Sequence, residues 1–134
     1  MTEFEHISQI MFRAGIAVPE YANMLKHLEF GLLEFYRKSE TVFLIRNNTY
    51  PWTRQIHLIP NAHAWEITTG LRELATQLFK NPQILRLEAE TSIKKLCIVL
   101  TRNGWKFDCI RPEAHLNENN ELVDLYMYSL RREK

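Results

Sequence analysis

A passage of strand, helix and strand periodicity in residues 54–90 constrains the fold more than any other feature. Residues 54–59 (RQIHLI) alternate in the manner of a strand, and Pro60 ends them. Apolar residues then recur at helical spacing over 71–79, and residues 84–90 alternate again. A strand, helix and strand unit of this length joins two parallel strands by a right-handed crossover. The sequence therefore predicts an α/β (α+β) protein with a mixed sheet.

The remaining segments fit around this unit as antiparallel strands and further helices. We expect one domain over residues 1–134, with a helical segment at 1–29 and the sheet and its helices at 30–130. Two short helices are predicted between Ile7 and Leu28, strands at 31–38, 41–46, 54–59, 84–90, 105–111 and 122–130, and helices at 71–79 and 93–102.

Finer expectations concern the strand at 84–90 and the helix after it. Leu85, Leu87 and Ala89 should point inward, because they alternate with polar residues. Ser92 is placed to cap the next helix with its hydroxyl group.

Charge and cysteine content narrow the classes of function. Seventeen Lys and Arg against sixteen Asp and Glu give a net charge of +1, so we expect no nucleic-acid partner and no membrane surface as partner. Cys97 and Cys109 lie in apolar patterns, which predicts buried, reduced thiols and a cytoplasmic protein. Of the histidines only His57 and His63 are close in sequence, without a nearby Cys or Asp, so no metal site is expected.

Four short sequence segments in the second half of the chain occur in an order that is typical of one protein family. They are RLEAE at 86–90, RNGWK at 102–106, DCIR at 108–111 and DLYMYSL at 124–130. In this order they resemble the Gcn5-related N-acetyltransferase superfamily, especially its small bacterial and phage-encoded members. The resemblance covers residues 30–130 and implies a mixed central sheet flanked by helices. We expect the amino-terminal part of the chain to be reduced, because no segment before Ile7 has the pattern of the family's usual first strand.

The resemblance implies an acyl-CoA-dependent N-acyltransferase, which moves acetyl from acetyl-CoA, or another acyl group, to an amine on a small molecule or peptide. The donor would lie between the strands at 54–59 and 84–90. Its binding residues would be Leu58, Ile59, Asn61, His63, Ala64 and Trp65.

One departure from the family concerns the turn at 60–67, which lacks the glycines that normally let the diphosphate approach the backbone. Glu66 would also bring a negative charge near the phosphates, whereas His63 falls near the family's basic position. The competing interpretation of this turn is purely structural: Asn61 caps the helix and Trp65 belongs to the core.

The proton chemistry is less complete in this sequence than in the family. His57 and Glu34 are the candidates for a base that takes the proton from the amine, although both could be structural residues. The position of the family's acidic tyrosine is Leu100, and Tyr126 or Tyr128 could replace it.

A second hypothesis follows from these departures. The chain could be a catalytically silent protein of this fold that acts as an interaction or phage virion-associated module. A homodimer is expected in either case, because strand edges in this family often pair.

Overall fold

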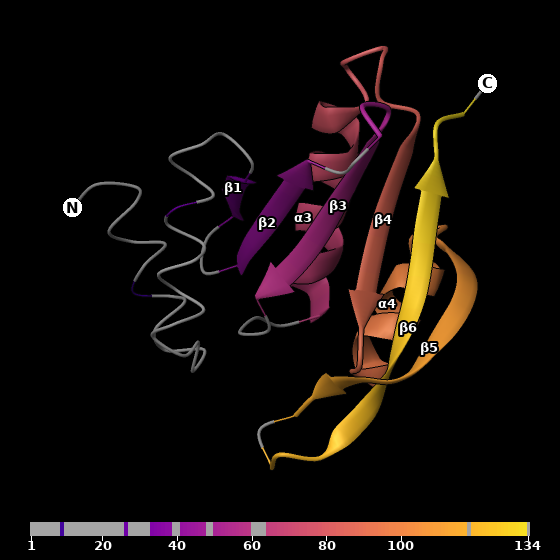
Figure 1. Cartoon of the computed structure of the whole chain (residues 1–134). Helices are drawn as coiled ribbons and strands as arrows, with labels where there is room; N and C mark the ends of the chain where they lie inside the picture. Colours follow the sequence, from indigo (N-terminus) through magenta and orange to yellow (C-terminus); the bar gives the residue numbers. More distant parts are fainter. Residues whose placement is uncertain are drawn as a thin grey trace.

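The computed structural model describes residues 9, 26, 33–38, 41–47, 50–59, 64–117 and 119–133 (Figure 1). Six strands form one sheet in the order β1–β2–β3–β4–β6–β5. The strands are β1 Leu33–Lys38, β2 Thr41–Asn47, β3 Thr53–Ile59, β4 Arg86–Thr91, β5 Lys106–Leu116 and β6 Leu122–Arg131. The helices are α3 Ala64–Leu78 and α4 Lys94–Arg102.

The strand pairing confirms the predicted mixed sheet. β3 and β4 are parallel and are joined through α3, whereas every other neighbouring pair is antiparallel. β1 and β2, both predicted as strands, pair as an antiparallel hairpin in which Leu33 lies opposite Arg46. The two predicted amino-terminal helices and the expected reduction of that segment lie outside the described residues, apart from Gln9 and Lys26, which are both helical.

β5 is longer than the predicted strand, which ended at Arg111. It continues to Leu116 across Pro112, a residue that normally argues against a strand. Proline is tolerated here because β5 is the last strand of the sheet, and the ladder to β6 is irregular on both sides of Arg111.

The prediction that Leu85 points inward is wrong. Leu85 is 50% exposed and precedes β4, with its N–H donating to the carbonyl of Trp52, whereas Leu87 and Ala89 are buried as predicted. The alternating pattern extended one residue beyond the strand, because chain reversal at this end of the sheet turns Leu85 outward.

The predicted helix cap at Ser92 is also wrong. Ile93 occupies the cap position of α4 and makes no side-chain cap hydrogen bond. The hydroxyl of Thr91 instead accepts a hydrogen bond of 3.0 Å from the N–H of Ile93, so the last residue of β4 stabilises the turn.

The cysteines differ from the expectation as well. They form no disulfide, and Cys97 is half-buried, but Cys109 is exposed. Cys109 lies on the edge strand β5, all of whose residues are exposed, so its apolar neighbours do not belong to the core.

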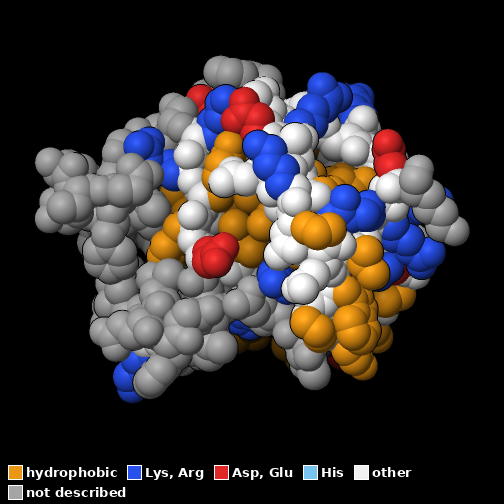
Figure 2. All heavy atoms as spheres, turned by 90° about the horizontal axis from the view of Figure 1, so that it is seen from above, with side chains coloured by type: hydrophobic (Ala, Val, Ile, Leu, Met, Phe, Trp, Pro, Cys, Tyr) orange, Lys and Arg blue, Asp and Glu red, His pale blue; other side chains and the backbone are white. Residues whose placement is uncertain are grey.

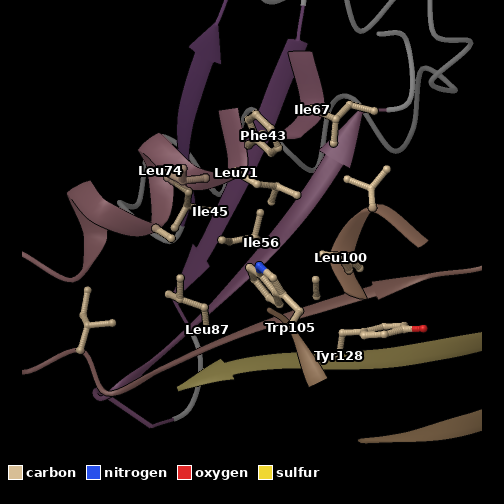
Figure 3. Packing of buried hydrophobic residues seen from close by; sticks show 14 residues of the cluster. Phe43, Ile45, Ile56, Ile67, Leu71, Leu74, Leu87, Leu100, Trp105 and Tyr128 are labelled. Atoms are coloured by element: carbon tan, nitrogen blue, oxygen red, sulfur yellow. The ribbon is translucent and has the colours of Figure 1, made fainter. Parts of the chain in front are cut away.

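The main core lies between the sheet and its two helices, which cover the same face (Figure 1). Phe43, Ile67, Leu71 and Leu74 meet between the strands and α3, and Trp105 lies between the sheet and α4 (Figure 3). These side chains are at most 5% exposed, so they supply the apolar burial that holds both helices on the sheet. The fully described cluster is Phe43, Ile45, Ile56, Ile67, Leu71, Leu74, Ala75, Ile84, Leu87, Ala89, Val99, Leu100, Trp105 and Tyr128.

A polar contact ties the outer strand β1 to α3. Glu73 of α3 accepts hydrogen bonds from the Tyr36 hydroxyl, at 2.8 Å, and from the Lys38 ammonium group. Lys38 first, and Tyr36 next, hold the pKa of Glu73 below its ordinary value. Burial, followed by the hydrogen bond to Glu73, raises the pKa of Tyr36.

Gly70 allows α3 to approach the sheet closely, and its replacement tests this packing. A Cβ at Gly70 would lie 2.6 Å from a ring carbon of Phe43. Overpacking costs about 1–3 kcal/mol, against a gain of about 1 kcal/mol in helix propensity. We expect Gly70→Ala to lower the free energy of unfolding in urea, whereas Gln77→Ala on the exposed side of α3 changes it by less than about 0.5 kcal/mol. A more stable Gly70→Ala protein would contradict this packing.

Acid should weaken the contact between β1 and α3. The pKa of Glu73 is lower in the folded protein than its ordinary 4.5, so its stabilising effect is present above that value and is lost as pH falls through the folded-state pKa. Glu73→Gln should therefore reduce the loss of unfolding free energy between pH 7 and pH 3. Lys38→Met should reduce it similarly, and an unchanged pH dependence in both variants would refute the contact.

Candidate functional site

The two parallel strands separate at their carboxyl ends. The ladder runs from Thr53–Arg86 to Ile56–Ala89 and stops there, although both strands continue. Residues 57–59 still pair with β2, and residues 90–91 still pair with β6. Their facing edges therefore carry backbone N–H and C=O groups that have no partner in the ladder.

A cavity of about 160 Å³ occupies this gap. An apolar cavity of about 150 Å³ holds a molecule the size of benzene, so the gap accommodates part of a ligand. Most of its lining is apolar and comes from six elements: β3, α3, β4, α4, β5 and β6. The lining residues are Ile56, His57, Leu58, Ile67, Leu71, Ala89, Glu90, Thr91, Ser92, Ile93, Leu96, Val99, Leu100, His115 and Leu125.

Three titratable side chains line the cavity: His57, Glu90 and His115. Ile56 and Ala89 point into the core on the helix side, so the next residue of each strand, His57 and Glu90, points to the opposite face. His57 is exposed, and the Glu90 side chain is 21% exposed.

A cation lies beside Glu90. Nη1 of Arg111 on β5 is 3.9 Å from Oε2 of Glu90, and the Arg111 side chain is largely exposed. At this distance and exposure the pair contributes little to stability, but it brings positive charge from β5 toward the carboxylate.

The residues predicted to hold the donor are only partly placed by the structure. Leu58 lines the cavity, and Ile59 is the last residue of β3. Ala64 and Trp65 are the first residues of α3, so this helix begins at the same end of the sheet as the cavity. Asn61 and His63 lie outside the described residues.

The two candidate bases are not brought together. His57 lines the cavity, whereas Glu34 is exposed on β1, opposite Ile45 of β2. β2 and β3 separate β1 from the cavity, so Glu34 does not line it.

The wall formed by α4 is apolar. Leu100, which stands where the resemblance places an acidic tyrosine, lines the cavity together with Leu96 and Val99. Tyr128 is buried beneath α4 and does not line the cavity, and burial, followed by a hydrogen bond to Cys97, raises its pKa. This tyrosine is therefore a weaker acid than an ordinary one.

The carboxylate of Glu66 in the first turn of α3 is engaged on the side of β2. Its Oε2 accepts a hydrogen bond of 3.3 Å from the hydroxyl of Thr41, which is fully buried. Glu66 does not line the cavity, but it lies in the first turn of α3, the end of the helix where the diphosphate was expected, so its negative charge remains a departure from the family.

The opposite end of the sheet carries a pair of exposed aromatic side chains. Tyr50 and Trp52 stack there with ring centroids 5.1 Å apart, and both are exposed. Figure 2 looks onto this end and shows Lys and Arg side chains scattered among apolar and polar ones.

Two of the three titratable residues that line the cavity, Glu90 and His115, were not predicted as site residues from the sequence. Glu90 could have been found, because the parallel pairing of its strand places it beside His57. His115 had no such signal, since the predicted strand ended at Arg111 and the irregular pairing beyond it is not visible in the sequence.

Solved acetyltransferase structures share this architecture. A ribosomal L7/L12 α-N-protein acetyltransferase aligns with 92% of this chain and 84% of its own, at a TM-score of 0.67 and 16% identity. The chain has the fold of the Gcn5-related N-acetyltransferases. The Gcn5-related fold also accounts for the mixed sheet that the sequence predicted, with the parallel β3–β4 pair at its centre.

Two further solved structures with the Gcn5-related fold are similar to this chain. A Bacillus subtilis acetyltransferase in complex with CoA aligns over 87% of both chains, at a TM-score of 0.58 and 14% identity. A spermidine N-acetyltransferase from Vibrio cholerae aligns with 79% of this chain and 69% of its own, at a TM-score of 0.65 and 10% identity. The chain spans 60% of the length of two other acetyltransferases that it matches.

Comparisons of the amino-acid sequence found no match: no protein-family model matches the chain, and no curated protein matches it. Among the described residues, no helix is both long and apolar enough to cross a membrane.

Proposed function

We propose that the protein is an acyl-CoA-dependent N-acyltransferase. The observation that carries this proposal is the cavity at the point where β3 and β4 separate, with His57 and Glu90 on one wall. A likeness of fold alone would not indicate a reaction, because one fold serves many functions.

The residues at the cavity fit an acyl-CoA thioester. Beyond the end of the β3–β4 ladder, the backbone groups of 58–59 and 90–91 that face the gap can hydrogen-bond the amide groups of its pantetheine arm, and the apolar lining suits the methylene groups between them. The N-terminus of α3, which begins at Ala64, offers backbone N–H groups to the diphosphate. Asn61, His63 and Trp65 stay in the proposal as donor-binding residues on the sequence argument alone, because Asn61 and His63 lie outside the described residues.

For acyl transfer to an amine, the most important side chain is one that accepts a proton. The acyl carbon forms a bond to the amine nitrogen as its bond to sulfur breaks, and the amine gives up a proton. His57 takes this proton in our proposal, because it lines the cavity and histidine exchanges protons readily near neutral pH. The carboxylate of Glu90 attracts the protonated amine toward the same wall, where the ammonium group first loses one proton to water; the neutral nitrogen then attacks, and His57 takes the second proton.

The apolar wall of α4 determines how sulfur leaves. Leu100 offers no proton, so the sulfur departs as a thiolate and is protonated by water. Catalysis therefore depends on the base and on the positioning of the amine.

The acceptor in this proposal is an amine of a small molecule or a peptide. The structural neighbours include an enzyme described as a spermidine N-acetyltransferase and one that modifies the N-terminal serine of a ribosomal protein. Spermidine and a short peptide with an amino-terminal serine are therefore suitable first probes.

Donor binding is tested by thermal unfolding with acetyl-CoA. At one hundred times its dissociation constant, acetyl-CoA should stabilise the protein by about 2.7 kcal/mol. Ala89→Phe should abolish this effect, because Ala89 is only 7% exposed and lines the cavity. Leu85→Phe, on the exposed residue just before the other end of β4, is the matched control and should keep it. The proposal fails if millimolar acetyl-CoA leaves the unfolding temperature unchanged.

Proton transfer is tested by turnover. His57→Gln should lower kcat for whichever amine probe is acetylated by about 10²–10⁴-fold, because a general base contributes this much, while acetyl-CoA binding persists. Glu34→Gln is the control, since Glu34 lies outside the cavity, and it should keep its activity. Equal losses in both variants would remove His57 from the role of base.

A further inference from the structure

The β5–β6 hairpin sends one titratable side chain to the cavity. His115 lines the gap together with Leu125, and the other lining residues lie between Ile56 and Leu100. No part of the resemblance assigns a role to His115, and its strand was expected to end before it. The cause of its position is in the pairing of β5 with β6.

A bulge in β5 sets this position. Arg111 pairs with Leu125, and the next pair is His115 with Val123. Three residues of β5 between these pairs therefore lie opposite a single residue of β6, Asp124. Regular antiparallel pairing would have placed Glu113 opposite Val123, so the bulge replaces a carboxylate by an imidazole at this register.

The bulge requires a backbone conformation that is costly for its central residue. Glu113 has a φ of +47°, in the left-handed region that L residues other than glycine rarely adopt. Its N–H donates a hydrogen bond of 3.0 Å to Oδ1 of Asp124. This bond joins the bulge to β6 at the one residue that it faces, and so stabilises the unfavourable conformation.

The bulge also lies between two side chains that reach the same site. On one side Arg111 lies 3.9 Å from Glu90, and on the other His115 lines the cavity. Bulges beside binding sites commonly redirect side chains in this way. β5 thus contributes a cation next to the carboxylate of the cavity and a second imidazole to its wall.

We propose that Asp124 is a positioning residue that keeps His115 in the cavity, where His115, His57 and Glu90 form the polar wall that receives the acceptor amine. This inference rests on the proposed acyltransferase function. His115 contacts the amine by accepting a hydrogen bond from its N–H, and Asp124 acts only through the bulge.

The test follows the histidine ring signals of the full chain by NMR during titration with CoA. His57→Gln and His115→Gln assign the two signals. We expect CoA to shift both signals in the parent protein, because both rings line the cavity that CoA fills. In Asp124→Ala the shift of His115 should fall at least twofold, with the shift of His57 unchanged. Asp124→Asn should behave as the parent, because its amide oxygen still accepts the hydrogen bond.

The outcomes separate this inference from the proposed function. A CoA-induced shift of His57 without one of His115, or a shift of His115 that is unchanged in Asp124→Ala, overturns the role of Asp124 and His115 but leaves donor binding intact. If neither ring responds and CoA does not raise the unfolding temperature, both proposals fail. Should Asp124→Ala not fold, Asp124→Val replaces it, since valine suits a strand and has no hydrogen-bond acceptor in its side chain, and the same loss is expected.

Discussion

The limited pairing between β3 and β4 is the constraint on which the other elements depend. Two parallel strands require a crossover, and α3 supplies it on the same face as α4. Their ladder ends at Ile56–Ala89, where the outer strands β2 and β6 continue to hold each strand in place. The sheet can therefore open at its centre without losing its edges, and the core beneath it stays packed. The cavity exists because hydrogen bonds to β2 and β6 keep each strand in place after the β3–β4 ladder has ended.

The sequence predicted most of the fold because apolar periodicity is strong in the buried elements. β2 and β3 were found to within one residue, and Leu87 and Ala89 are buried as expected, whereas α3 begins at Ala64, seven residues before the predicted helix at 71–79. The errors concern residues whose environment depends on distant chain segments. Leu85 continues an alternating pattern but lies beyond the strand, and Ser92 gives way to Thr91 as the residue that stabilises the turn.

The candidate site was less accessible from the sequence than the fold. The position of His57 near the end of the parallel pair could be predicted, because the sequence indicates both strands of that pair. Parallel pairing places the carboxyl ends of the two strands at the same end of the sheet, where they separate. Glu34 is also on a strand, but sheet order places two strands between it and the cavity. His115 depends on a bulge and on a residue with positive φ, and neither has a reliable signal when Glu113 rather than glycine occupies the position. Local periodicity thus locates the strands, whereas which side chains lie next to one another depends on the order and the pairing register of the strands.

Pro112 affects how readily strands of other molecules can pair with the exposed edge of β5. β5 is the last strand of the sheet, and all eleven of its residues are exposed, which is the type of edge that recruits strands from other molecules. Proline offers no N–H at its position, and the irregular pairing on both sides of Arg111 bends the strand. An incoming strand could therefore form only short runs of hydrogen bonds with this edge. The same irregular segment that carries His115 thus also limits the addition of a further strand at this edge of the sheet.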